Sequence, residues 1–418
     1  MARLDTLLAQ TPINNLSPAG CTAVEAVVRA HLGETFPALA LTVINRGDVL
    51  LNAAWGWIDP DAQTLPVQPD TLFDLASVSK LFTTTAFLSL VSAGRVALHD
   101  PLVSVIPEFG ITGPRPLDGG QDPHSKAPLP TPESVRGQTA DPLQVSFYHL
   151  LTHTSGLAPW RDVFKAAGPP PAPPEQTDAV PRAERWSRAL HALCQYPFVG
   201  QPGDGIVRYS DLGLLLVGEA TSRLHGTPGA LDAAITARVC APLGLTSVTF
   251  NPLHHDYAQS MTAPTEDDPG WRGRRCWGEV HDENACGVGG VAGHAGLFST
   301  ARDVAALGQA WLAHDPRLSI TLDVQQPAVS EREFTGDTRR GLGWMIKAPQ
   351  NASAGDRFSP QSFGHTGFTG TSLWIDPERR LVVACLTNSV YPGRGKPGTH
   401  EFRRAIHDTL AVEADGSA

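Results

Sequence analysis

The sequence predicts an α+β fold in which helices flank a mostly antiparallel central sheet and a mainly helical domain is inserted. Strand-like segments gather near both ends of the chain, and helix-like segments dominate its middle. With 418 residues, of which 41% are hydrophobic and 18% charged, the chain can bury a large core and is neither disordered nor a coiled coil. We therefore expect an α/β domain at residues 1–100 plus 286–418, and a helical insertion with long loops at residues 101–285.

The first quarter of the chain predicts a helix, a hairpin and a second helix. Residues 18–32 carry valines and a leucine at helical spacing and end at Gly33. Residues 39–44 and 49–57 flank an Asn-Arg-Gly-Asp turn, which is typical of a β-hairpin. Residues 77–93 are mostly apolar, so we expect a buried helix there.

The middle of the chain alternates loops and helices. Residues 113–142 and 168–181 are rich in proline and polar residues without periodicity, which predicts surface loops. Residues 211–224 and 228–243 have helical spacing. Alternating or continuous apolar residues then predict four late strands and a terminal helix, at residues 341–346, 362–367, 371–375, 381–387 and 399–412.

Composition excludes several kinds of partner. The net charge of −10 disfavours nucleic-acid binding, and the longest apolar runs have strand length, well below the roughly 18 residues of a membrane helix. The first twenty residues contain Asp5, Gln10 and Asn14 where a secretory leader would be apolar. We expect a cytoplasmic protein, or a periplasmic or secreted one if a leader has been removed. The six cysteines form no CxxC pair and are expected to be free, and the oligomeric state is left open.

Ser77 and Lys80 form an SxxK motif at the start of a predicted helix. The spacing puts the lysine amine one turn from the serine hydroxyl, so the two can touch. Serine becomes a good nucleophile when a neighbouring group takes its proton, and a helix N-terminus stabilises negative charge nearby. The motif alone would be weak evidence, since chance supplies about 0.3 copies in a chain of this composition.

Further motifs follow the SxxK motif in order, and together they resemble the superfamily of serine β-lactamases and penicillin-binding proteins. The branch most similar to this chain holds class C β-lactamases, D-Ala-D-Ala peptidases and related esterases. The likeness covers most of residues 38–410. Its other elements are Tyr209-Ser210-Asp211, His365-Thr366-Gly367, LLTHTSGL at 150–157, PLGL at 242–245 and GHAGLFSTARD at 293–303.

This resemblance implies a fold and a set of roles. The fold would be β-lactamase/transpeptidase-like, with the site in the cleft between the two domains. Ser77 would be acylated, Lys80 and Tyr209 would share its proton, and the backbone N–H groups of Ser77 and Phe368 would form the oxyanion hole. The expected substrate-binding residues are Asp211, His365, Thr366 and Gly367. Trp160 follows the LLTHTSGL segment and is expected to line the substrate cleft, with packing in the core as the equal alternative. The substrate would be a small molecule or short peptide, and no cofactor is implied.

Two departures from the family pattern bear on the substrate. His365 stands where class C β-lactamases usually have lysine, so a fixed cation for a substrate carboxylate is weakened at neutral pH. Asp211 replaces the usual asparagine and, when ionised, cannot donate a hydrogen bond. The first hypothesis is therefore hydrolysis of an amide or ester, such as a D-amino-acid peptide. A class C-like β-lactamase and a non-catalytic binding protein remain the alternatives.

One polar segment offers another kind of chemistry. Residues 280–285, VHDENA, together with His294 supply four side chains that could bind a metal ion. Their spacing matches no familiar zinc pattern, and serine chemistry needs no metal. We therefore expect no metal, and interpret the segment as a hydrogen-bonded loop lining the cleft. Similar segments occur in some members of the resembled family. His153 is interpreted as structural, and Asp211 could equally be an ordinary helix-start carboxylate.

Overall fold

The computed structural model describes residues 13–416 and is built around one antiparallel sheet. Its nine strands lie in the order β1-β3-β2-β16-β15-β14-β13-β12-β11, and every neighbouring pair is antiparallel. The α+β prediction is therefore confirmed, because β16 from the end of the chain pairs with β2 from its beginning. The strands are β1 (Ile13–Asn14), β2 (Ala38–Asn45), β3 (Asp48–Gly56), β11 (Glu333–Thr335), β12 (Thr338–Arg340), β13 (Met345–Ile346), β14 (Phe363–Thr366), β15 (Ser372–Asp376) and β16 (Leu381–Thr387).

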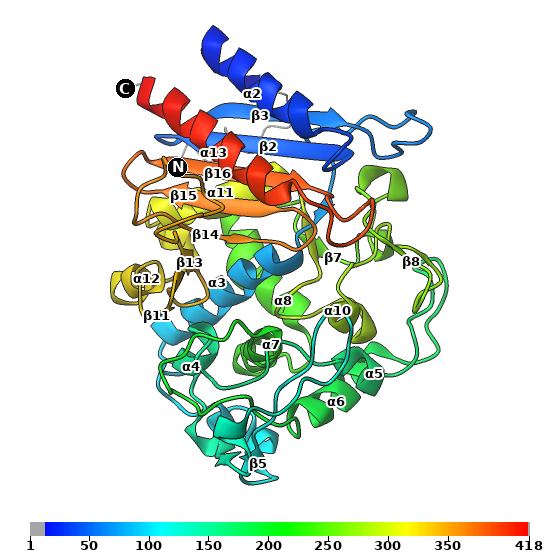
Figure 1. The fold of residues 1–418 in the computed structure, drawn as a ribbon, viewed down its shortest axis with the longest axis vertical. Helices are drawn as coiled ribbons and strands as arrows, with labels where there is room; N and C mark the ends of the chain where they lie inside the picture. The colour runs from blue at the N-terminus through cyan, green and yellow to red at the C-terminus, as the bar shows by residue number, and fades with distance from the viewer. Residues whose placement is uncertain (1–12, 417–418) are drawn as a thin grey trace.

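Helices cover both faces of this sheet. Helices α2 (Pro18–His31) and α13 (Thr399–Gly416) lie side by side on one face, whereas α11 (Ala301–Leu312) packs against β2, β15 and β16 (Figure 1). Strand β2 is buried on both faces, so its alternate residues enter two separate hydrophobic cores. Leu39, Leu41 and Val43 belong to the core beneath α2 and α13, and Ala38 and Ala40 to the other.

The second core continues from the sheet into the middle of the chain. Helix α3 (Ser79–Ser92) is buried along nearly its whole length and packs against α7 (Asp211–His225). The other helices of this region are α4 (Phe147–Leu151), α5 (Val163–Ala167), α6 (Arg182–Leu193), α8 (Leu231–Ile235), a π-helical turn (Thr236–Cys240), α9 (Ala241–Leu243) and α10 (Glu283–Gly287). Figure 1 shows α4, α5, α6 and α7 farther from the strands than α3 is. The domain boundaries at residues 100 and 285 remain a prediction.

A small second sheet supports the start of α3. It has three strands in the order β4-β10-β7, namely Phe73–Asp74, Leu297–Ser299 and Thr249–Phe250. Strand β4 ends just before Ser77, and β10 follows the segment that contains His294. The sheet therefore brings residues 73–80 next to residues 294–299. Two short hairpins, Arg115–Pro116 with Thr139–Ala140 and Asp267–Asp268 with Arg274–Arg275, lie in the loops.

The predicted strand at residues 341–346 is wrong in one respect. Residues 341–344 form a turn between β12 and β13 instead of continuing a strand. A side chain at Gly341 would collide with the carbonyl of Ala328, and Gly343 has φ of +74° and lies against Thr84. The two glycines therefore let the chain turn tightly against α3, which an apolar pattern alone does not reveal.

Two other expectations concern the cysteines and membrane-spanning helices. The six cysteines are free, as expected. Within residues 13–416, every helix is too short or too polar to span a bilayer. Residues 1–12, on which part of the localisation hypothesis depends, lie outside the described residues.

Candidate active site

Ser77 lies on a short 3₁₀ turn, Ala76–Val78, that leads directly into α3. Ala76 has φ of +45°, a left-handed conformation that costs energy for a residue with a β-carbon. Its backbone N–H donates to Oδ1 of Asp74 over 2.8 Å, which stabilises this turn. Gly367 packs against it so closely that an added β-carbon would lie 2.6 Å from the carbonyl oxygen of Leu75. The turn thus presents Ser77 beside strand β14.

The three predicted catalytic side chains meet at the serine oxygen. Nζ of Lys80 lies 2.7 Å and the hydroxyl of Tyr209 lies 2.8 Å from Oγ of Ser77, and both donate to it. Lys80 also forms an ion pair with Asp211, 2.7 Å from Oδ1, and donates to the carbonyl of His294 over 2.9 Å. Two hydrogen bonds and one ion pair thus hold the ammonium group behind Ser77.

Two opposing influences set the resting charges of this cluster. Burial favours neutral Lys80, but the negative charge of Asp211 and the nearby Tyr209 outweigh it, so the pKa of Lys80 is raised. Burial also raises the pKa of Tyr209, and the opposing effect of Lys80 does not cancel the increase. At neutral pH the resting pair is therefore an ammonium and a phenol. The pair must lose one proton before it can accept the proton of Ser77.

The imidazole ring of His153 packs against Tyr209. The imidazole of His153 lies 4.7 Å from its ring centroid and accepts a hydrogen bond from the backbone N–H of Ser210 over 3.1 Å. Burial, with the charges of Arg340 and Lys80, lowers the pKa of His153 well below its usual value, so this ring is neutral. These contacts support the interpretation of His153 as a structural residue.

Ser77 opens into a cavity of about 640 Å³ along the end of strand β14. The cavity wall includes six of the predicted site residues, Ser77, Tyr209, His365, Thr366, Gly367 and Phe368. Lys80 and Asp211 lie behind Ser77. Asp211 is in the first turn of α7, and its carboxylate forms an ion pair with Lys80. Trp160 is buried against Phe164 and does not line this cavity.

His365 differs from the cation that the family pattern places at the start of the strand motif. Its Nδ1–H donates to the carbonyl of Thr366 over 2.8 Å. Burial, together with the charges of Arg340 and Lys80, moves its pKa well below the usual value. His365 is therefore neutral across the physiological range, and a positive charge for a substrate anion must come from another residue.

Two arginines that sequence reasoning missed supply positive charge along the cavity. Arg340, at the end of β12, is 6% exposed and holds its guanidinium 5.1 Å from the centroid of the Tyr209 ring. Arg403, on α13, donates through Nη2 to the carbonyls of Gly367 and Thr371, each over 2.7 Å. No motif marks either arginine, because each reaches the site from a separate segment of the chain.

The segment considered for zinc binding forms two separate pairs instead of a metal cluster. Nε2 of His281 lies 2.8 Å from Glu266, and Nε2 of His294 lies 2.8 Å from Asp282. Among the described residues no group of three or more histidine, cysteine or acidic side chains is arranged to hold a metal ion. His294 nevertheless reaches the site, since its backbone carbonyl accepts from Lys80.

Comparison with known proteins agrees with this geometry. The Beta-lactamase family model matches residues 24–408. A protein of Salmonella agona named "Putative D-alanyl-D-alanine carboxypeptidase" is 30% identical over 388 residues, which cover 86% of this chain and 81% of the relative.

Solved structures share the fold at lower identity. EstCE1, described as a hydrolase with promiscuous acyltransferase activity, superimposes with a TM-score of 0.67 at 18% identity and covers 94% of this chain and 98% of its own. A penicillin-binding protein homologue from Caulobacter crescentus gives a TM-score of 0.66 at 19% identity, with 96% and 100% covered. The protein is a serine hydrolase of the penicillin-binding-protein and β-lactamase type. With its family model matched along nearly the whole chain, it belongs to the β-lactamase family.

Proposed function

We propose that this enzyme removes the last residue from a short peptide that ends in a D-amino acid, through an acyl-enzyme on Ser77. The observation that carries this proposal is the guanidinium of Arg340. It lines the cavity beside Ser77, and its Nε and Nη1 have no hydrogen-bond partner within residues 13–416. A buried, unpaired cation is costly unless a ligand supplies the anion. A free C-terminal carboxylate has the charge and the two-oxygen shape that suit a guanidinium.

The neutral His365 strengthens this assignment. Burial lowers the pKa of Arg340 only to about 10, so Arg340 stays charged at neutral pH where His365 does not. The D configuration is supported by the relative from Salmonella agona, whose name refers to D-alanyl-D-alanine and which matches 86% of this chain.

Acylation follows from the arrangement at Ser77. After the Lys80–Tyr209 pair has lost one proton, it accepts the Ser77 proton while Oγ attacks the carbonyl carbon of the scissile amide. The oxygen of that carbonyl becomes negative and is stabilised by the backbone N–H groups of Ser77 and Phe368. The C–N bond then breaks, and Tyr209 passes a proton to the departing amine. The product at this stage is an ester between Ser77 and the shortened peptide.

Deacylation uses the same groups in reverse. A water molecule replaces the departed amine and gives its proton to the Lys80–Tyr209 pair as it attacks the ester. The carboxylic product leaves, and Ser77 regains its proton. No step requires a metal or an organic cofactor.

The test compares two peptides that differ only at the C-terminus. Nα-acetyl-Lys(acetyl)-D-Ala-D-Ala and the same peptide as its C-terminal amide are incubated with wild-type enzyme and with Ser77→Ala, and released D-alanine or D-alaninamide is measured. We expect hydrolysis of the free acid by wild type, about 100-fold slower hydrolysis of the amide because the Arg340 contact is lost, and none by the variant. Equal rates on both peptides would contradict the role of Arg340.

Intact-protein mass spectrometry with a penicillin separates the other hypotheses. A long-lived adduct on Ser77 agrees with a peptidase, whereas a short-lived adduct with release of penicilloate would indicate a β-lactamase. Ester hydrolysis without peptide hydrolysis would indicate an esterase. If neither a penicillin nor a fluorophosphonate labelled Ser77, a non-catalytic binding protein would be the better interpretation.

A further inference from the structure

We propose that the dipeptide His281-Asp282 is a brace that positions both Ser77 and Lys80, and that Asp74 and His294 are its two arms. The proposal rests on the proposed acyl-enzyme at Ser77, and it assigns a role to residues that touch neither substrate nor the reacting atoms. His281 reaches the serine turn through Asp74, and Asp282 reaches the lysine through His294. All four are therefore positioning residues.

The first arm runs from His281 to the nucleophile. The backbone N–H of His281 donates to Oδ2 of Asp74 over 2.6 Å, while Oδ1 of the same carboxylate accepts from the N–H of Ala76 over 2.8 Å. Asp74 is 2% exposed, so these two N–H groups account for its buried oxygens. Ala76 is the left-handed residue directly before Ser77. The carboxylate thus compensates the conformational cost of the turn that aims Ser77 at the cavity.

The second arm runs from Asp282 to the lysine. Oδ1 of Asp282 accepts both from Nε2 of His294, over 2.8 Å, and from the backbone N–H of Ala285, over 2.7 Å. The backbone carbonyl of His294 is the acceptor that lies 2.9 Å from Nζ of Lys80. The His294 side chain is 1% exposed, so its ring has little room to move. Fixing this ring fixes the carbonyl that orients the ammonium group.

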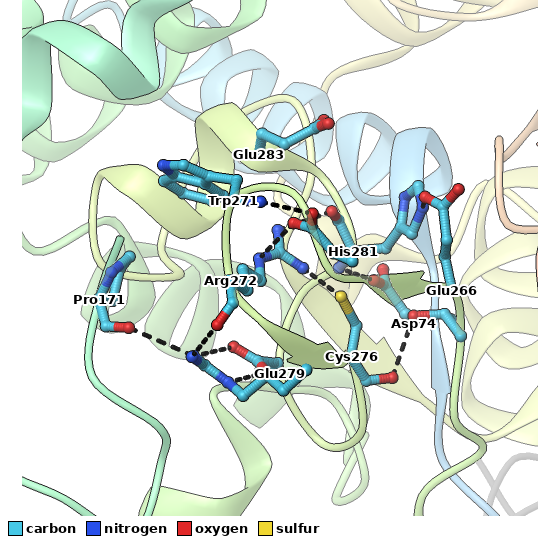
Figure 2. A network of polar contacts seen from close by, with 12 residues as sticks. Asp74, Pro171, Glu266, Trp271, Arg272, Cys276, Glu279, His281 and Glu283 are labelled. Atoms are coloured by element: carbon cyan, nitrogen blue, oxygen red, sulfur yellow. Dashed lines mark hydrogen bonds and ion pairs between the residues drawn. The ribbon is translucent and has the colours of Figure 1, made fainter. Parts of the chain in front are cut away.

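The brace is itself anchored on its outer side. Figure 2 shows Asp74, Glu266 and Arg272 gathered around His281. Arg272 donates to the carbonyl of His281 over 2.8 Å and also contacts the Cys276 thiol. The His281 ring stacks on Phe368 at 5.6 Å with an interplanar angle of 22°. The same dipeptide therefore contacts the proposed oxyanion-hole residue, and one rigid segment serves three parts of the site.

Asp74 and Asp282 use their carboxylate oxygens differently, so the same Asp→Asn substitution should have different effects at the two positions. Asp74 uses both oxygens on different N–H groups, so Asp74→Asn replaces one acceptor by an amide that faces an N–H donor. Asp282 uses one oxygen for both contacts, so Asp282→Asn keeps that acceptor and loses only the charge. Asp282→Leu removes the acceptor at similar size. Asp303→Leu is the matched control, because Asp303 is 3% exposed and bonds Ser247 on a different part of the fold.

The readout is the labelling of Ser77 by a fluorophosphonate, in which Oγ bonds to phosphorus and fluoride leaves. This reaction needs the activated serine but not the peptide site, and the maximal labelling rate and the half-saturating probe concentration are measured separately. We expect Asp74→Asn and Asp282→Leu to lower the maximal rate about 30-fold or more with a nearly unchanged half-saturating concentration, and Asp282→Asn and Asp303→Leu to stay within about threefold of wild type. Thermal melting confirms that each variant is folded.

The outcomes distinguish this inference from the proposed function. Wild-type rates in Asp74→Asn and Asp282→Leu would overturn the brace, and so would an equal loss in Asp303→Leu. A loss in Asp282→Asn as large as in Asp282→Leu would also overturn it, because charge instead of position would then matter. Failure of the peptide assay, with normal labelling of wild type and impaired labelling of Asp74→Asn, would refute the peptidase and leave the brace supported.

Discussion

Arg340 and Arg403 are two buried arginines that line the same cavity, yet their surroundings differ. Each is less than 10% exposed, and burial lowers the pKa of each to about 10. Arg403 gives Nη2 to the carbonyls of Gly367 and Thr371, which lie on either side of the turn after β14. Arg340 contacts the face of Tyr209, and its Nε and Nη1 find no acceptor in the part of the chain that the structure describes.

The acceptors around each guanidinium distinguish an arginine that supports the fold from one that can bind a substrate. The fold supplies two carbonyl acceptors for the charged end of Arg403, although its Nε has no hydrogen-bond partner within residues 13–416. Within residues 13–416, the guanidinium of Arg340 lies against an aromatic face and its Nε and Nη1 have no acceptor, and such a face compensates a buried charge less well than a carboxylate would. An anion from the substrate would complete the site.

Substitution of Arg340 gives the largest expected effect. In Arg340→Ala, kcat/KM for the free-acid peptide is expected to fall about 100-fold, mainly through KM, because one partner of a buried charged contact is lost. The amidated peptide should be hydrolysed at nearly the wild-type rate. Steady-state kinetics on the two peptides measure this, with Arg340→Lys as the variant that keeps the charge. Equal losses on both peptides would show that Arg340 supports Tyr209 instead of binding substrate.

Substitution of Arg403 should act on the fold and on both substrates alike. Arg403→Met removes two charged hydrogen bonds, while the carbonyls of Gly367 and Thr371 each keep a backbone N–H donor, so the free energy of unfolding should fall by about 1–3 kcal/mol. Because the turn after β14 carries Phe368, kcat should also fall, by about tenfold, with the ratio of free-acid to amide rates unchanged. Denaturant unfolding and the same kinetic pair check both parts. A selective loss on the free acid would remove the distinction between the two arginines.

The contrast between the arginines also shows what the sequence could predict. The fold class, the hairpin and the Ser77–Lys80–Tyr209 cluster were predictable, because each depends on local periodicity or on a motif of a few residues. His365 was identified, and the loss of a fixed cation at neutral pH follows from the ordinary pKa of histidine. The further lowering of its pKa depends on burial and on Arg340, which only the tertiary structure brings near.

Arg340, Arg403 and Asp74 could not be found in this way. Each is a single residue outside any motif, and its role arises from a contact with a distant segment, such as Asp74 with His281. The 280–285 segment did stand out by its polar side chains. Spacing alone leaves its chemistry open between metal binding and a cleft loop, because it does not show that Asp282 pairs with His294.

Substitution of Asp211 should have a smaller effect, on the pH dependence of kcat/KM. Its carboxylate raises the pKa of Lys80 against burial and, with burial, raises the pKa of Tyr209. Asp211→Asn removes this charge, so both groups should lose their protons more easily. We expect the acidic limb of the kcat/KM profile to move to lower pH, which makes the variant faster than wild type at acidic pH. A limb that stays in place or moves upward would show that another group controls it.

The smallest effect concerns stability in acid and reaches back to Arg340. Burial, with the charge of Arg340, holds the pKa values of His153 and His365 well below the usual value, so both bind protons more readily when the chain unfolds. Each histidine should therefore lower the free energy of unfolding by about 1.4 kcal/mol per pH unit below about pH 6.5, and have no effect well above it.

In Arg340→Ala the repulsion between Arg340 and the protonated histidines is gone, so the native pKa values rise. The loss of stability with falling pH should then end at a higher pH than in wild type. Melting curves from pH 5 to 8 compare the variant with wild type. Arg403→Met is the matched control, because Arg403 lowers the pKa of His365 less than burial, Arg340 or Lys80 does. Identical pH dependence in wild type and Arg340→Ala would mean that the charge on Arg340 does not reach the histidines, and the claim that it is uncompensated in the resting enzyme would fail with it.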